Sequence, residues 1–215
     1  MMERPSQRAI ALNALCAIEF EAGNDGASYI ACKRAVDDGR SGGLDVTAVD
    51  LTNFAESSRS LFKLDEAERI GLEASELEVS WYGNPWVELA ELYTREGRYA
   101  EALGALKRVP QYRAQRPPHV RDADRNETRR AIASFLLVTS RAEHAIAVTD
   151  RALVLPDRRA HNSRDPAQDR VVIALLDRRA KRLLAEQRLE AASALPFYER
   201  PKAWLSALYL RVRAL

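Results

Sequence analysis

Cysteine, glycine and proline are scarce in this chain, and it contains no long apolar run. Its 215 residues include 2 Cys, 9 Gly and 9 Pro, a composition that excludes fibrous and broadly disordered chains. No stretch approaches the roughly 18 apolar residues that a membrane-spanning helix needs. The start of the chain, MMERPSQRAIALNAL, lacks the basic end and apolar run of a signal peptide. We therefore expect a cytoplasmic protein without a membrane span, long enough to bury a substantial core.

The two cysteines, Cys16 and Cys32, fall on apolar positions of successive predicted helices. Two interpretations are open: a disulfide, metal or redox pair, or two reduced thiols that behave as small hydrophobic side chains in the core. Two cysteines without clustered histidines do not make a structural zinc site. We expect reduced core thiols and no metal.

Lysine is scarce relative to arginine, and the charges are unevenly distributed. The chain has 28 Arg but only 5 Lys, which is typical of a GC-rich bacterial genome. Residues 1–105 carry 10 basic and 19 acidic side chains, a net charge of −9, whereas residues 106–215 carry 23 and 12, a net charge of +11. This polarity favours an acidic partner at the C-terminal half or head-to-tail self-association. The alternative is a set of solvated faces with no specific partner.

Small residues recur at a fixed spacing along the first three quarters of the chain. Three pairs of alanines lie 12 residues apart: Ala55 and Ala67, Ala90 and Ala102, Ala133 and Ala145. Around the middle pair, PWVELAELYTREGRYAEALGALKRV places Trp86, Leu89 and Tyr93 on one helical stripe, and Gly97 separates it from a second amphipathic helix. The two helices of such a pair can approach closely at the alanines. No single pair covers its own apolar face, so neighbouring pairs must stack on both sides.

These units resemble tetratricopeptide repeats, helix–turn–helix units of about 34 residues with a W-x₂-L-G-x₂-Y signature and spaced alanines. The unit at 83–116 matches best, and the resemblance covers about 9–159. It implies an all-α fold: a right-handed α-solenoid of stacked antiparallel helix pairs with extra C-terminal capping helices. We predict about four pairs in residues 1–160, interrupted by an insertion at 110–124, and a helical extension in 161–215 that caps the same solenoid.

The boundaries outside the repeats follow from prolines and apolar spacing. Pro117 and Pro118 exclude helix within the insertion. After a loop at 156–166, Asp165 and Pro166 open a long amphipathic helix that reaches residue 192. A last helix over 202–215 carries a stripe of large apolar residues: Trp204, Leu205, Leu208, Tyr209 and Val212. We expect this stripe to shield the open end of the solenoid or to dock a partner.

No pattern of residues points to catalysis. Neither a phosphate-binding glycine loop nor a G-x-S-x-G turn occurs. The three histidines, His119, His144 and His161, have no partner at a metal-ligand spacing. Glu88 and Glu91, close to Arg95 and Arg98, are interpreted as i,i+4 ion pairs on one helix. The arginine clusters at 108–130 and 158–182 are interrupted by acidic residues and contain few aromatic residues, which disfavours nucleic acid. We expect no cofactor.

The resemblance also implies where a partner binds. The first helix of each pair lines the concave side of the solenoid, so the positions between its core residues are expected to face a groove. Nine of these positions form the predicted partner-binding site: Thr52, Glu56, Arg59, Val87, Glu91, Thr94, Arg95, Arg130 and Ser134. Both charges and some apolar surface are present, which suits an extended or helical peptide. Ordinary exposed helix faces are the other interpretation.

The function predicted from the sequence is therefore a non-catalytic protein–protein interaction adaptor, which binds a peptide or helix of a partner protein in this groove. The alternative is an accessory or regulatory subunit of a larger bacterial assembly, docking through the basic C-terminal half. An enzyme with an unrecognised site also stays open.

Overall fold

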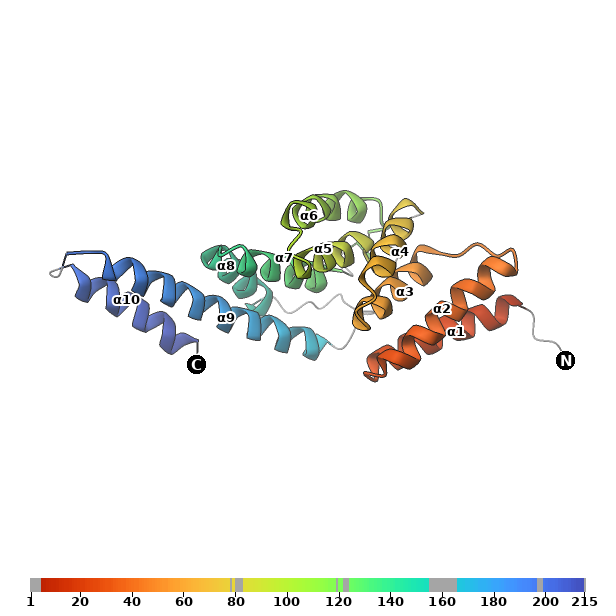
Figure 1. The fold of residues 1–215 in the computed structure, drawn as a ribbon, viewed down its shortest axis with the longest axis horizontal. Coiled ribbons are helices and arrows are strands. Elements are labelled where there is room, and N and C mark those ends of the chain that lie inside the picture. Colours follow the sequence, from red (N-terminus) through yellow and green to blue (C-terminus); the bar gives the residue numbers. More distant parts are fainter. Residues whose placement is uncertain are drawn as a thin grey trace. The chain divides into compact units, whose positions relative to one another are not determined.

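The computed structural model of the protein describes residues 5–77, 79, 83–118, 120–121, 124–154, 166–196 and 199–214, and its regular structure there is helical (Figure 1). These ranges contain ten helices and no strand: α1 (Pro5–Glu21), α2 (Asp25–Ser41), α3 (Ala48–Ser60), α4 (Leu64–Glu76), α5 (Pro85–Arg95), α6 (Tyr99–Ala114), α7 (Arg125–Val138), α8 (Ala142–Val154), α9 (Pro166–Ser193) and α10 (Arg200–Arg213). The predicted all-α fold is confirmed. None of the described helices has the length and apolar character needed to cross a bilayer.

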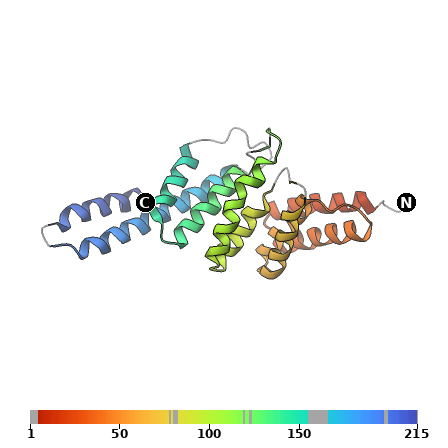
Figure 2. The ribbon, with the colours of Figure 1, turned by 90° about the horizontal axis from the view of Figure 1, so that it is seen from above.

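The helices pack in adjacent pairs, and the chain divides into two compact units. Unit 1 spans Met1–Asp124 and contains α1 to α6, and unit 2 spans Arg125–Leu215 and contains α7 to α10. Short turns join the antiparallel helices of a pair, as the red and orange ribbons of α1 and α2 show in Figure 2. These units differ from the predicted ranges, 1–160 and 161–215, because α9 packs against both α7 and α8. The right-handed winding of the solenoid stays a prediction.

Local signals set the turns between paired helices. Gly97 has a φ of +76°, a left-handed conformation that glycine adopts without steric cost. The N–H of Arg98 then donates to the carbonyl of Tyr93 at 2.9 Å and closes α5, as the predicted break at Gly97 requires. At the start of α3, Thr47 and Asp50 form a reciprocal capping box. The positions of these turns are therefore encoded locally.

The alanines that repeat along the sequence lie in the core. All six members of the three pairs are at most 4% exposed: Ala55, Ala67, Ala90, Ala102, Ala133 and Ala145. Gly71 plays the same part between α4 and α5, because a Cβ added there would meet Cδ2 of Leu89 at 3.0 Å. The expectation that helices meet across small residues is confirmed.

The insertion begins later than the sequence indicates. α6 continues through Pro110 to Ala114, so the predicted range 110–124 is wrong over its first five residues. Proline removes one backbone hydrogen bond, but Val109 and Tyr112 on either side of Pro110 are buried and anchor the helix. The described residues between α6 and α7 are non-helical, as Pro117 and Pro118 predict, and residues 119, 122 and 123 lie outside the described ranges.

The two C-terminal helices form at the predicted places, but the apolar stripe of the last one does not shield a core. α10 packs against α9 in unit 2, and its buried residue is Ala207, whereas the stripe from Trp204 to Val212 is exposed. The predicted loop at 156–166 and the Asp165 cap fall almost wholly outside the described residues, which resume at Pro166.

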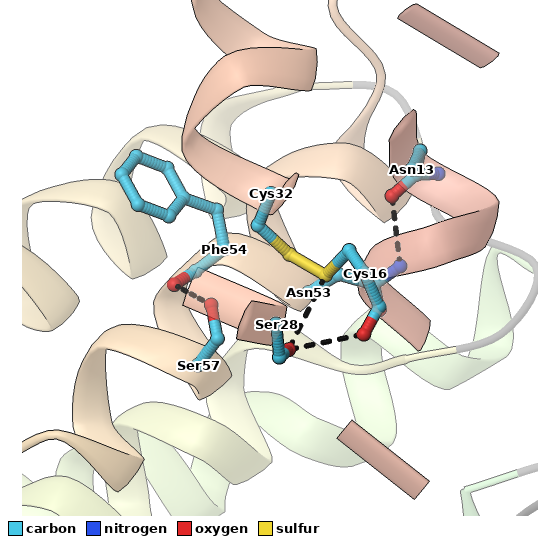
Figure 3. The surroundings of a disulfide bond; sticks show 7 residues. All are labelled: Asn13, Cys16, Ser28, Cys32, Asn53, Phe54 and Ser57. Atoms are coloured by element: carbon cyan, nitrogen blue, oxygen red, sulfur yellow. Dashed lines mark hydrogen bonds between the residues drawn. A yellow bond between two sulfur atoms is a disulfide. The ribbon is translucent and has the colours of Figure 1, made fainter. Parts of the chain in front are cut away.

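The cysteines form a disulfide rather than the predicted pair of reduced thiols. Cys16 of α1 and Cys32 of α2 are both 1% exposed and are joined, with their Cα atoms 5.1 Å apart (Figure 3). Ser28 lies beside them and donates a hydrogen bond to the Cys16 carbonyl at 3.0 Å. The apolar spacing of the two residues is the same for either state, which is why the sequence did not separate them. Such bonds are rare in cytosolic proteins, and the cytoplasmic location stays a prediction.

Replacing both cysteines with alanine should lower the free energy of unfolding by about 3 kcal/mol, because the bond closes a loop of 16 residues in the unfolded chain. Urea unfolding followed by circular dichroism measures the change. A reducing agent should destabilise the native chain and leave the Cys16→Ala/Cys32→Ala variant unchanged. Equal responses of the two proteins to the reducing agent would contradict the disulfide.

Replacing one of the buried, repeated alanines with a larger residue should also destabilise the protein. Ala102 is 0% exposed, so Ala102→Leu should cost about 1–3 kcal/mol of unfolding free energy through overpacking. Ala100 lies exposed on the same helix, and Ala100→Leu should change stability by less than about 0.5 kcal/mol. Similar losses for both variants in urea unfolding would show that close approach at Ala102 is not required.

Candidate functional site

The nine predicted partner-binding residues lie on the first helices of their pairs, as expected, but most of them are not at the surface. Arg95 is exposed, and Arg130 and Ser134 are partly buried. The other six are buried: Thr52, Glu56, Arg59, Val87, Glu91 and Thr94. The expectation that these six face solvent is wrong. In unit 1, α3 and α5 pack against each other, so positions between the core residues of one helix are covered by the next.

Arg59 is the centre of a buried charge network, here called the Arg59 network. Its guanidinium lies 2.9 Å from Glu88 and 3.3 Å from Glu91, both on α5, and 3.7 Å from Glu56 on its own helix. Ion pairs taken out of water are costly to break, by about 3–5 kcal/mol for the loss of one partner. The network therefore fixes α3 against α5.

Helical spacing predicts ion pairs of Glu88 and Glu91 within one helix, and Glu88 is not among the nine predicted partner-binding residues. In the structure both glutamates reach Arg59, which is 29 and 32 residues earlier in the chain. Helical spacing reports neighbours on the same helix only. At the 35-residue interval between Ala55 and Ala90, Glu91 aligns with Glu56 but Arg59 aligns with Thr94, so the spacing gave no signal that Arg59 lies beside the two glutamates.

Three further residues that were predicted to face the groove, Thr52, Val87 and Thr94, are enclosed by neighbouring residues instead. Thr52 donates to the Ala48 carbonyl at 2.6 Å, and a Cβ at Gly83 would lie 2.7 Å from the Thr52 methyl group. Val87 is 0% exposed. Thr94 differs, because its buried hydroxyl oxygen has no hydrogen-bond partner within the described part of the chain. These three side chains therefore lie inside unit 1 and do not form its surface.

A second network, the Asp124 network, holds the segment after α6. Asp124, which is 0% exposed, accepts hydrogen bonds from Asn84 at 2.7 Å and Arg113 at 2.9 Å, and lies 3.1 Å from Arg116. Arg116 also donates to the carbonyl of Gly83. Asn84 meanwhile caps α5 through the N–H of Trp86. Arg113 and Arg116 belong to the arginine cluster at 108–130, but both bind Asp124 inside unit 1.

Unit 2 contains a comparable arrangement between α8 and α9. Lys181 is buried and pairs with Asp177, and Asp177 accepts a hydrogen bond from Thr149 at 3.0 Å. Lys181 also lies 3.7 Å from Asp150. Arg188 on the exposed side of α9 pairs with Glu143 at 3.0 Å. Part of the positive charge of the C-terminal half is thus neutralised within the chain.

The turn between α5 and α6 carries a further network, which shifts the pKa values of Glu68, Tyr93 and Arg98. Arg98 binds both oxygens of Glu68, at 2.7 and 2.9 Å, and Tyr93 donates to the same carboxylate at 3.0 Å. The hydrogen bonds from Arg98 hold the pKa of Glu68 below its ordinary value. Burial, followed by the bond to Glu68, raises the pKa of Tyr93 to about 12.

These networks join helices through ion pairs between carboxylates and cations. Within the described ranges, no group of three or more His, Cys, Asp and Glu residues is arranged to hold a metal ion. What the arrangement does chemically is to fix the relative positions of neighbouring helices. Comparison of the chain with models of known families, with curated proteins and with solved structures found no match.

The Glu68–Arg98 pair should make stability depend on pH. Because the folded pKa of Glu68 is lowered, its contribution is fully present above the unfolded value of about 4.3 and is lost as pH falls through the lower folded pKa. The difference in unfolding free energy between the native chain and Glu68→Gln should therefore shrink below about pH 4.3. Urea unfolding at several pH values measures it. Glu76→Gln, at the exposed end of α4, is the matched control, and an equal pH dependence for both variants would contradict the assignment.

Proposed function

We propose that this chain is a non-catalytic adaptor that binds another protein through the helix faces of tetratricopeptide-like pairs. The observation that supports it is the alanine seam: six small residues at repeated spacing are buried where successive helices meet. Helices stacked in this way form rigid, extended faces rather than enclosed cavities, and proteins built from them use those faces for recognition.

The proposed binding face has two layers in unit 1. The Arg59 network and Thr52 lie beneath it and hold α3 and α5 in place. Arg95, near the C-terminal end of α5, is exposed above them. A face that is already ordered loses little conformational freedom when a partner binds. The buried members of the predicted site therefore act as its support, and Arg95 contacts the partner.

In unit 2, Arg130 and Ser134 lie on α7 at the positions that Val87 and Glu91 occupy on α5, and there they are partly exposed. They can contact the same class of ligand on that unit. Arginine at both places favours a peptide with acidic side chains, because guanidinium groups bind carboxylates bidentately. An extended or helical acidic peptide is the partner that this face fits.

The alternative, an accessory subunit that docks through the basic C-terminal half, has less support. Arg113, Arg116 and Lys181 belong to the basic clusters on which it depends, and all three engage acidic residues inside the chain. The bacterial origin and the cytoplasmic location remain part of the proposal.

A photo-crosslinking residue placed at Arg95 should capture a protein from the source lysate that the same residue placed at Arg69 does not. Arg69 is exposed on α4 and pairs with Glu73 at 3.8 Å, so it samples a different face of unit 1. Binding of the captured protein to purified chain should fall at least about tenfold for Arg95→Glu, through charge repulsion, and stay unchanged for Arg69→Glu. Equal capture at both positions would contradict the proposed face.

A further inference from the structure

The helix α10 combines strong positive charge with an apolar surface that the described part of the chain leaves uncovered. Its sequence, RPKAWLSALYLRVR, contains four basic residues and no acidic one. Five of its large apolar side chains are between 53% and 67% exposed: Trp204, Leu205, Leu208, Tyr209 and Val212. An exposed apolar patch of this kind on a folded protein marks an interaction surface.

The side of α10 that packs on α9 carries small residues, and the opposite side carries the large apolar ones. The helix rests on α9 through small residues, with Ala207 and Ala214 both 0% exposed. At 3.6 residues per turn, the large apolar residues fall on the opposite side and span an arc of about 140°. An ordinary surface helix directs its large apolar residues toward the core. In α10 they face outward, so packing among the described residues does not account for them.

Cations border this arc along both edges. By the same helical periodicity, Arg200 and Arg211 lie at one edge and Lys202 and Arg213 at the other. The guanidinium of Arg213 lies 5.9 Å from the centre of the Tyr209 ring, which places it against the apolar surface. Long basic side chains so placed can lay their stems on an apolar surface and extend their charges past it.

A shallow pocket extends the apolar surface onto α9. It has a volume of about 460 Å³ and is lined by Leu189 of α9 with residues of α10, among them Trp204, Leu205 and Leu208. Arg211 stands at its border. The exposed apolar surface is thus shared by the two helices of this hairpin.

We propose that α10 binds the surface of an anionic lipid bilayer, lying parallel to the membrane. Trp204, Leu208 and the other large side chains would enter the boundary between headgroups and acyl chains, while the basic edges contact lipid phosphates. A basic, amphipathic helix with aromatic residues is suited to this interface. An anionic bilayer presents negative headgroups along both flanks of a helix that lies on it, which complements the two basic edges and the absence of any acidic group on α10.

This surface is separate from the one assigned to Arg95. The lipid-binding hairpin lies in unit 2, whereas Arg95 belongs to unit 1. An adaptor with both surfaces would hold its protein partner at a membrane. Vesicle binding does not require the protein partner, so each proposal can fail while the other stands.

The test is flotation of the purified full chain with phosphatidylcholine vesicles, with and without phosphatidylglycerol. We expect binding to the anionic vesicles, weakened by salt and much reduced on phosphatidylcholine alone. Leu208→Glu should reduce the affinity for the vesicles at least about tenfold, because it removes an apolar contact with the acyl chains and adds a charge that the anionic surface repels. Lys202→Gln and Arg213→Gln should each reduce binding to anionic vesicles about fivefold.

Ile18→Glu is the matched control, because Ile18 is 61% exposed on α1 in unit 1, close to the 56% of Leu208. It should leave vesicle binding unchanged, and circular dichroism should show native helicity for every variant. Absence of vesicle binding by the native chain, or equal losses for Leu208→Glu and Ile18→Glu, would overturn the proposal. A dimer that Leu208→Glu dissociates, without vesicle binding, would assign the surface to a second copy of the chain and also overturn it.

Discussion

Close approach of helices across alanine is the contact on which the rest of this structure depends. At Ala90 and Ala102 the side chains end at Cβ, so α5 and α6 can meet closely while Leu89 and Tyr93 fill the adjacent space. Gly71 extends the same arrangement between pairs, since Leu89 occupies the volume that a side chain there would need. Paired helices packed in this way leave further apolar surface at their flanks, and the next pair covers it.

Buried charges add directional contacts to this apolar packing. Arg59 joins α3 to α5, Asp124 joins the end of the insertion to the start of α5, and Lys181 with Asp177 forms part of the contact between α8 and α9. Such pairs add little net stability compared with apolar residues, but each is costly to leave half-made. They favour one arrangement of helices over other packings of similar apolar content. They also reduce the charge that the chain presents to a partner.

The sequence predicted the helices, their pairing and the burial of the alanines, since these depend on local propensity and on a spacing that recurs in three of the helix pairs. It failed where exposure depends on a neighbouring helix. Glu91 was placed in an open groove, whereas it lies beside Arg59 of another pair. Cys16 and Cys32 were correctly placed in the core, but a buried thiol and a buried disulfide leave the same apolar pattern. Pro110 marked a boundary that buried neighbours overrode.

The last helix shows most clearly which features the sequence determines and which depend on the tertiary structure. The periodicity of residues 202–215 determined that a helix forms there and that its large apolar residues share one side. It also determined that the helix carries basic residues and no acidic ones. Only the tertiary structure decided that Ala207 and Ala214 face α9 and that Trp204 and Leu208 remain exposed. Periodicity describes the two sides of one helix, whereas the side that is covered depends on the shape of the helix that packs against it.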